Sequence, residues 1–483
     1  KAKLKPSKKI SLVLENMSDD EWNEEFQPSY KGVSIRSQNK IVKPLYDFFK
    51  NKINEKVNST NLTFFMQALL HINIIRIEIN ENEEAFALFE RTNARGKALE
   101  VSDLLKNHIF MKKSDEDSEK IEDAWEIITQ NSKNQIIRML KYFYVSKNGY
   151  TTKSKLYRGI KKLGESNIDK LLYDIKEFSE FYDAFSNGNE AKINEILKIK
   201  CQNSSGAFSL DEANISEIFK SIQGLNHFRI TQVIPIIYSF LGCYEKLKLS
   251  DFKKYNKTIP LFFYYLESYH FINNFICDRV GNEVEKFYSE YSKRFHNVFD
   301  VTGFIECLNN FYDELKKKLA TYDEFESKFI EDLTYDHSNT LDIMYVFDRL
   351  INRNSKREWS LEHSFFNPED RLLRKKFNIE HWYPQKSQLN LDDKVDIHNI
   401  GNLLVIPNKL NKILQNHTPH KKAELIKEDK QFYSINYIND FIKEYKDYLE
   451  SWDNNIIKLR ANTLAKKAYN ETWRFDPPNI KIN

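Results

Sequence analysis

The hydrophobic pattern near the N-terminus predicts a strand followed by helices. Isoleucines occupy every second position between residues 75 and 79 in "NIIRIEIN", which is the period of a half-buried strand. The next stretch, "ENEEAFALFERTN", opens with acids that suit the first turn of a helix and places its apolar residues on one face, until Gly96 interrupts the pattern. Ser102 is placed to cap a further helix, "DLLKNHIF". We therefore expect one local unit of strand and helices here.

The middle of the chain, from about residue 115 to 350, has the pattern of an almost wholly helical domain. Segments such as "IDKLLYDIKEFSEFYDAF" and "TIPLFFYYLESYHFINNFICDRV" carry apolar residues three and four positions apart, as helices that bury one face do. No internal repeat with a fixed period of about 20 to 50 residues is present. The expected role of this domain is that of a spacer or a sensor.

After about residue 360 the pattern changes to short strands and helices. "FNIEHWYP" and "IGNLLVIP" predict two strands, and "NKLNKILQN" predicts the start of a helix. In the final segment Ile457, Leu464, Ala468 and Trp473 lie near helical spacing. We expect that helix to pack on the two strands.

Length and composition support a folded chain of several domains. At 483 residues the chain is too long for one ordinary core, so two or three domains are expected. Hydrophobic residues make up 41%, while only 12 Gly and 11 Pro are present, which favours packed and mostly helical structure.

Net charge, cysteine spacing and the length of apolar runs each bear on which class of protein this chain is. Lys and Arg number 73 against 70 Asp and Glu, so the net charge of +3 does not by itself indicate a nucleic-acid binder. The four cysteines are widely spaced without a Cys-x-x-Cys pair, which argues against a zinc knuckle and favours reduced thiols in the cytoplasm. Neither a signal peptide nor an apolar run of membrane-spanning length is present, so we expect no membrane partner.

Glu380, His381, Asn402 and Asn411 are the residues of the C-terminal segment that suit phosphodiester hydrolysis. That reaction requires a base that deprotonates water and a cation that stabilises charge on the phosphate and the leaving oxygen. Histidine titrates near neutral pH, and Mg2+ prefers oxygen ligands such as a carboxylate and an amide carbonyl. Neighbouring strand residues point to opposite faces, so Glu380 and His381 can share a site only where the strand ends or bulges. Pro384 favours such an end.

The stretch "EHWYPQ" followed by "IGNLLVIPNKLN" resembles the His-Asn-His (HNH) nuclease motif of the ββα-metal fold. In that motif an acid-His-x-x-Pro strand precedes an asparagine on the second strand and another on the helix. The resemblance implies that His381 is the general base, that Glu380 and Asn411 bind Mg2+ or Mn2+, and that Asn402 orients His381. The cysteine pairs of the zinc-stabilised branch are absent, so we expect hydrophobic packing to hold this fold.

The stretch "FALFERTNARGKALEVSDLLKN" resembles part of the ParB/sulfiredoxin-like domain of GmrSD-type restriction proteins, which couple that nucleotide-using domain to an HNH domain. The family's Asp-Gly-Gln-Gln-Arg motif, associated with nucleoside triphosphate use, does not occur in this sequence, so we expect part of the nucleotide pocket to lie upstream of Lys1. Asn93, Arg95 and Gly96 form a turn where Arg can reach a phosphate and Gly permits close backbone approach. The alternative is a turn between helices with a solvated Arg.

DNA contacts are expected from basic residues beside the HNH motif, because phosphates are normally bound by Lys and Arg. The candidates are Arg371, Arg374, Lys375, Lys376, Lys409 and Lys412. Such runs are also common on solvated surfaces that bind nothing.

We predict an α+β, mainly α chain. Its domains are a partial ParB/sulfiredoxin-like domain at 1–115, a helical domain at 116–350 and an HNH (ββα-metal, His-Me finger) domain at 351–483. The resemblance implies a Mg2+-dependent DNA endonuclease that nicks or cuts modified foreign or phage DNA in bacterial defence. A second copy of the chain and other defence-system proteins are candidate partners, and a nucleoside triphosphate is a candidate ligand of the full-length protein.

Two alternatives stay open at this point. One is a nucleotide- or nucleic-acid-sensing regulator with an inactive nuclease domain, in which Glu380 and His381 form a structural polar pair and the asparagines cap turns. The other is a nuclease that acts on RNA, because the motif does not distinguish the two substrates.

Overall fold

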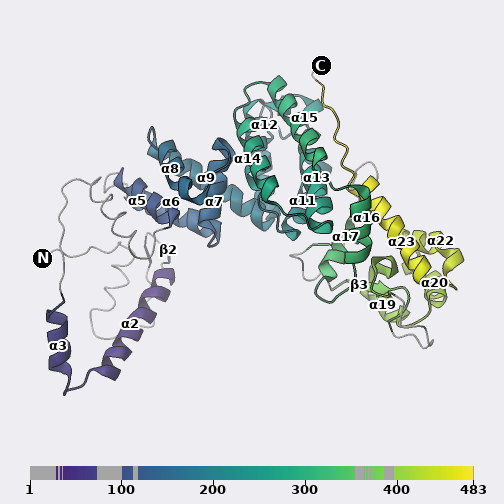
Figure 1. Ribbon diagram of the computed structural model, residues 1–483, viewed down its shortest axis with the longest axis horizontal. Helices are drawn as coiled ribbons and strands as arrows, with labels where there is room; N and C mark the ends of the chain where they lie inside the picture. The colour runs from purple at the N-terminus through teal and green to yellow at the C-terminus, as the bar shows by residue number, and fades with distance from the viewer. Residues whose placement is uncertain are drawn as a thin grey trace. The chain divides into compact units, whose positions relative to one another are not determined.

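The computed structural model describes residues 29–30, 33–34, 36–72, 100–112, 118–353, 375–385 and 396–481, with residues 364, 366, 367, 370 and 373 (Figure 1). The chain forms two compact units, Lys1–Asn80 and Glu81–Asn483. Helices dominate the described residues, which confirms the mainly α class. The strand expected at 75–79, the helix after it, and Asn93, Arg95 and Gly96 lie outside the described residues.

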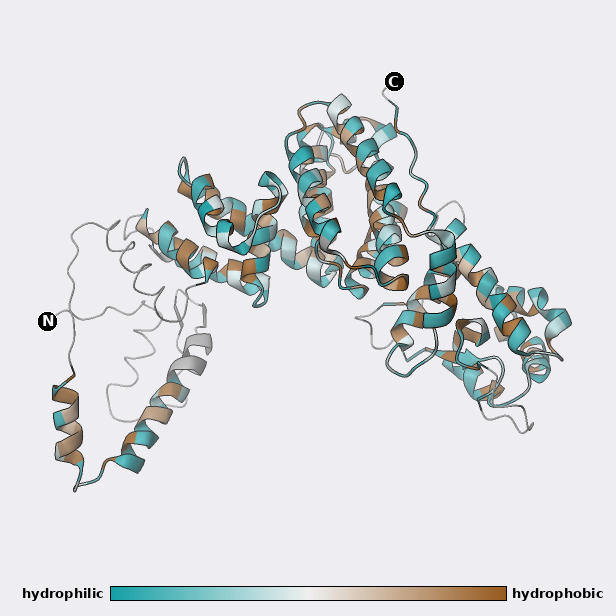
Figure 2. Ribbon diagram, viewed as in Figure 1, coloured by the Kyte–Doolittle hydropathy of each residue, from teal (hydrophilic) through white to brown (hydrophobic). Residues whose placement is uncertain are grey.

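The first unit contains a short hairpin and two helices. Strand β1 (Ser29–Tyr30) pairs antiparallel with β2 (Val33–Ser34), and the helices are α2 (Arg36–Lys56) and α3 (Leu62–Leu70). Helix α3 carries mostly apolar side chains, which appear brown in Figure 2, and most of them are exposed among the described residues.

The larger unit begins with a run of helices that confirms the expected helical middle. They share one hydrophobic core, rich in Phe and Tyr, in which the apolar stripe of each helix faces its neighbours. The helices are α5 Val101–Met111, α6 Ser118–Ser132, α7 Ile136–Asn148, α8 Lys153–Leu163, α9 Ile168–Asn187, α10 Glu190–Lys200, α11 Glu212–His227, α12 Ile234–Lys246, α13 Thr258–His270, α14 Asn282–His296 and α15 Val301–Lys317, with short 3-10 turns η2 Leu249–Asp251 and η3 Lys253–Tyr255 and a π-helical turn η4 Phe271–Ile276.

Side-chain caps explain where several of these helices begin. The Asn167 side chain accepts a hydrogen bond from the first turn of α9, and Asp300 does the same for α15. The cap expected from Ser102 was wrong. Helix α5 already begins at Val101, and the cap is Glu100, whose backbone N–H donates to Asp103 in a capping box, so Ser102 lies buried inside the helix.

The C-terminal part is built around a two-stranded ribbon. Strand β3 (Phe377–His381) pairs antiparallel with β4 (Leu403–Pro407), as the two apolar runs predicted, and α19 (Asn408–Leu414) follows directly. The remaining elements are α16 Tyr322–Asp332, α17 Thr340–Asn352, the 3-10 turn η6 Ile400–Asn402, α20 Pro419–Glu428, α21 Lys430–Tyr433, α22 Asn436–Glu444, the 3-10 turn η7 Lys446–Tyr448, α23 Asn454–Lys467 and the π-helical turn η8 Ala468–Thr472.

Each face of the ribbon covers a separate core because side chains alternate along a strand. Ile379, Leu403 and Val405 pack with α16, α17 and the second half of α23. Leu404 and Ile406 point the other way and pack with α19, α20 and α22. The boundary expected at 350 stays a prediction, although α16 and α17 share the core of the strands.

Helix α23 packs on the ribbon as predicted, and one glycine makes the approach possible. A Cβ on Gly401 would lie 2.0 Å from the carbonyl oxygen of Ile457. The buried Arg460 of the same helix donates from Nη1 to the carbonyl oxygens of Gly401 (2.7 Å) and Leu403 (2.8 Å). Backbone of β4 and η6 is therefore tied directly to α23.

Two further expectations concern membranes and thiols. Among the described helices, none combines the length and the apolar character needed to cross a bilayer. All four cysteines are free and buried, and no disulfide joins them.

Candidate functional site

Glu380 and His381 end strand β3 on opposite faces of the ribbon. The register pairs Glu380 with Leu404 and His381 with Leu403, and it continues without a bulge to the last residue of the strand. The chain bends directly after His381. Of the two features that would let Glu380 and His381 share a site, the end of the strand is therefore present and a bulge is not.

His381 is buried but borders a group of polar side chains at the surface. Its Nε2 lies 3.3 Å from Nδ1 of His398 and 3.2 Å from Nε2 of Gln385, and both of these partners are exposed. The ring of Tyr335 packs edge-on against it, with centroids 4.8 Å apart. Burial lowers the pKa of His381 to about 4, helped by His398 and Lys422. The imidazole is therefore neutral near pH 7, so one of its two ring nitrogens carries a lone pair that can accept a proton.

Glu380 faces a buried lysine from helix α20. Lys422 is fully buried, and its Nζ lies 2.5 Å from Oε1 of Glu380. The same ammonium group donates to the carbonyl oxygens of His381 (2.6 Å) and Trp382 (3.1 Å). Lys422 is therefore the charged partner of Oε1 of Glu380 as well as the donor to these two carbonyl oxygens. Burial raises the pKa of Glu380 and lowers that of Lys422, while their attraction opposes both shifts.

Asn402 is fully buried and holds the loop that follows His381. Its Oδ1 accepts from the backbone N–H of Tyr383 (2.8 Å) and from the indole of Trp452 (3.1 Å). Its Nδ2 donates to the carbonyl oxygens of Tyr383 (3.0 Å) and Ile397 (2.8 Å). None of these bonds reaches the His381 ring, so any orienting effect of Asn402 acts through the backbone of the loop.

Asn411 lies half-buried on α19, on the same side of the ribbon as Glu380. Leu410 and Leu414 of this helix are buried in the core beneath Leu404 and Ile406. No side-chain hydrogen bond of Asn411 is found among the described residues. The described part of the chain also holds no cluster of three His, Cys, Asp or Glu side chains suited to a metal ion.

The basic candidates that the structure describes gather at the other end of the ribbon. Asn408 donates from its backbone and side chain to the carbonyl oxygens of Lys376 (2.7 Å) and Lys375 (3.1 Å), which places both lysines beside the start of α19. Both are exposed, as are Lys409 and Lys412. Lys376 precedes β3 and is five residues from His381, so about 17 Å of extended chain separates the two. Arg371 and Arg374 lie outside the described residues.

Two residues that touch the motif were not predicted from the sequence. His398 lies four positions before Asn402. A second histidine so close to the motif could have been predicted from the sequence as a neighbour of His381. Lys422 lies many residues after the motif, in a helix with three consecutive polar residues. The neighbouring sequence does not distinguish Lys422 from Lys421, which is exposed. Only the tertiary structure shows that Lys422 is buried.

Comparison with known families gives matches at both ends of the chain. Residues 3–110 match the N-terminal domain of the GmrSD restriction endonucleases, and residues 319–467 match their C-terminal domain. Residues 79–207 match a family described as an uncharacterized protein conserved in archaea. No curated protein matches the chain. Glu380, His381, Asn402, Asn411 and Lys422 all fall within the C-terminal match. With both of its domain models matched in the expected order, the chain belongs to the GmrSD restriction endonuclease family.

Proposed function

We propose that this chain is a Mg2+-dependent DNA endonuclease whose general base is His381. The observation that carries the proposal is the placement of a buried, neutral imidazole at the end of β3, beside exposed polar groups. The order of β3, β4 and α19 along the chain is the one that an HNH domain requires, which supports the proposal. All three elements lie inside the match to the C-terminal domain of restriction endonucleases.

In the proposed reaction His381 accepts a proton from a water molecule as its oxygen attacks the phosphorus. The new P–O bond forms while the bond to the leaving sugar oxygen breaks, and that oxygen then takes up a proton. Lys422 fixes the backbone on which the His381 ring is carried, through its bonds to the carbonyl oxygens of His381 and Trp382. Asn402 fixes the next turn through the backbone of Tyr383.

We propose that Glu380 and Asn411 hold the metal ion, Mg2+ or Mn2+. Both offer side-chain oxygens of the kind that hard cations prefer. When bound, the ion would stabilise negative charge on the phosphate and the leaving oxygen. The Lys422 ammonium lies against the same carboxylate, so it competes with the ion for Glu380.

The basic residues beside the motif would bind the DNA backbone. Lys375, Lys376, Lys409 and Lys412 are exposed, and the first two precede β3, so the length of that strand, which spans several base pairs of a duplex, separates them from His381. We propose that the substrate is modified foreign or phage DNA and that the protein acts in the cytoplasm in bacterial defence. Nucleoside triphosphate use and partner proteins of the defence system belong to the same proposal.

The test compares the wild-type protein with His381→Ala and His296→Ala on plasmid DNA and on modified phage DNA, with Mg2+ or with EDTA. His296 is an exposed histidine on α14 and serves as the matched control. We expect wild type and His296→Ala to cleave with Mg2+, EDTA to stop cleavage, and His381→Ala to lose about a hundredfold or more in rate, as removal of a general base does.

Each alternative predicts a different result. Cleavage by His381→Ala at the wild-type rate would rule out His381 as the base. DNA binding without cleavage by the wild type would favour a regulator with an inactive nuclease domain. Cleavage of an RNA strand of the same sequence, with DNA left intact, would assign the activity to RNA.

A further inference from the structure

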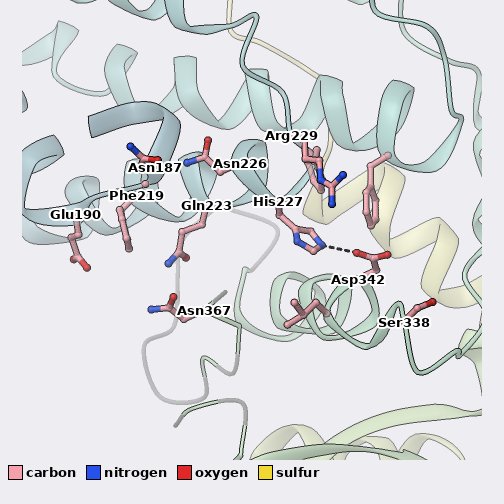
Figure 3. Close-up of a pocket in the computed structure, with 14 residues that line it drawn as sticks. Asn187, Glu190, Phe219, Gln223, Asn226, His227, Arg229, Ser338, Asp342 and Asn367 are labelled. Carbon is pink, nitrogen blue, oxygen red and sulfur yellow. Dashed lines mark ion pairs between the residues drawn. The ribbon is translucent and has the colours of Figure 1, made fainter. Parts of the chain in front are cut away.

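A cavity of the larger unit lies between helices of the helical part and α17, and no residue of strand β3 lines it. It has a volume of about 700 Å3, within the range of small-molecule sites in proteins. Helix α11 supplies one wall, the turn between α9 and α10 another, and α17 the wall opposite α11. In Figure 3, His227 of α11 and Asp342 of α17 meet in its lining, with Nε2 and Oδ1 2.7 Å apart.

The lining of this first cavity combines aromatic rings, side-chain amides and two carboxylates. Phe219, Phe228 and Phe275 supply aromatic surface. Gln223 is 5% exposed, and its Oε1 has no hydrogen-bond partner among the described residues. A buried acceptor left without a donor costs free energy, so a ligand that offers an N–H group there would recover it. Flat rings with N–H groups at the edge, as in nucleobases, have this chemistry.

A second cavity of about 340 Å3 adjoins the first and is basic. The two share Asn187, Asn226 and Arg229 in their walls. The second adds Lys133 and Arg138 together with serine and threonine hydroxyls, and no acidic side chain is among the described residues that line it. Guanidinium, ammonium and hydroxyl groups without a neighbouring carboxylate are the usual surroundings of a bound phosphate.

Asn226 and Arg229 stand at the junction of the two cavities. The Nδ2 of Asn226 donates to the carbonyl oxygen of Phe185 (2.9 Å), which fixes the amide in place. Arg229 is exposed and has a φ of 58°, so its backbone turns directly after α11. One charged side chain therefore borders an aromatic chamber and a basic chamber at once.

We propose that the two adjoining cavities bind one nucleotide, with its base in the aromatic cavity and its phosphate in the basic cavity. A free nucleotide and a nucleotide turned out of a DNA strand share this chemistry. The site is lined by the helical part and by α17 and shares no residue with the proposed nuclease site, so it does not depend on His381.

Calorimetric titration of the full chain tests the proposal with deoxycytidine and deoxyguanosine 5′-monophosphates, the matching nucleosides and inorganic phosphate. We expect a monophosphate to bind at least about tenfold more tightly than its nucleoside and than inorganic phosphate. Gln223→Leu should weaken both monophosphate and nucleoside, because it removes the amide but keeps the volume. Arg229→Asn should weaken the monophosphate alone, and Asn tolerates the positive φ.

The control is Arg158→Asn, which removes an exposed arginine of α8 that lines neither cavity and should leave the affinities unchanged. Titration with a DNA duplex that carries 2-aminopurine, in EDTA, distinguishes a free nucleotide from a nucleotide turned out of DNA. A rise in 2-aminopurine fluorescence that is lost in Gln223→Leu would assign the site to an extruded base. Failure of both free nucleotides and this duplex to bind would overturn the proposal. So would equal affinity in wild type, Gln223→Leu and Arg229→Asn, since the ligand would then sit elsewhere.

Discussion

Lys422 shows how much a single buried charge can matter to the motif. It lies against Glu380 and also holds two carbonyl oxygens of the chain that carries His381. Lys422→Met keeps the volume but leaves the Glu380 carboxylate buried without a counter-charge. We expect a loss of about 3–5 kcal/mol in the free energy of unfolding, measured by urea denaturation.

A double substitution separates the ion pair from other effects of Lys422. Adding Glu380→Gln to Lys422→Met should restore part of the lost stability, because the uncompensated charge is gone. Lys427→Met changes an exposed lysine of the same helix and should shift stability by less than about 0.5 kcal/mol. Strictly additive losses in the double variant would show that the two charges do not interact.

Gly401 is the other residue at which one small change should have a large effect. A methyl group there would lie 2.0 Å from the carbonyl oxygen of Ile457 and 2.9 Å from its carbonyl carbon, both in the backbone of α23. Because backbone cannot turn aside as a flexible side chain does, Gly401→Ala must push α23 from the ribbon. We expect a loss of more than about 3 kcal/mol, measured by thermal unfolding.

Gly242 provides a matched control for this substitution. It lies inside α12, and nothing lies within 4 Å of the position its Cβ would take. Gly242→Ala should therefore raise stability by about 0.5–1 kcal/mol, because alanine favours the helix. Equal melting temperatures for Gly401→Ala and wild type would contradict the close approach of α23.

At the scale of elements, the local hydrophobic pattern was enough to predict the helices and the two strands. The residues that contact the motif depend on long-range packing, which the local pattern does not contain. The apolar periods of α9, β3 and β4 are complete within each segment, so their types and approximate bounds followed from sequence. The partners of the motif did not, since Lys422 is buried only because α20 packs under β3. Ser102 failed as a cap because Glu100 and Asp103 form a capping box that begins two residues earlier.

A buried ionic cluster joins three helices of the larger unit. Glu267 of α13 is fully buried and accepts hydrogen bonds from Arg349 Nε of α17 (2.9 Å), Arg353 Nη2 (2.6 Å) and Ser221 Oγ of α11 (2.9 Å). Burial alone would raise the pKa of Glu267, but the two arginines outweigh burial and hold the pKa at about 2. The cluster therefore makes the packing of these helices sensitive to acid.

The direction of that sensitivity follows from the depressed pKa. Stability from ionised Glu267 is complete above its ordinary pKa of 4.5 and is lost as the pH falls through about 2. The shift corresponds to about 3 kcal/mol. The difference in melting temperature between wild type and Glu267→Gln should stay constant above pH 4.5 and shrink below it. Tyr345→Phe removes another hydrogen bond to Glu267 but keeps the charges, so it should retain the acid dependence; a difference that grows in acid would contradict the assignment.

At the scale of the whole larger unit, the segment after η8 ties its C-terminal part to the helical core. Trp473 stacks on Phe271 with ring centroids 3.6 Å apart, in the core shared with β3 and β4. Two residues later Phe475 enters the core of the helical part. The hydroxyl of Tyr265 on α13 donates to the carbonyl oxygen of Asp476 (2.7 Å). A chain end that reaches two cores should stabilise both.

Removal of residues 474–483 tests this role of the chain end. The truncation takes Phe475 out of its core and the carbonyl acceptor away from Tyr265, so we expect the free energy of unfolding to fall by about 3–5 kcal/mol and the melting temperature to fall with it. Removal of residues 481–483 alone leaves these contacts in place and should have little effect. If the two truncations melted at the same temperature as the full chain, the packing of Phe475 would contribute nothing to stability. Because the strands and His381 are untouched, the longer truncation should still cleave DNA at temperatures below its melting point, which separates this stabilising role from the proposed chemistry.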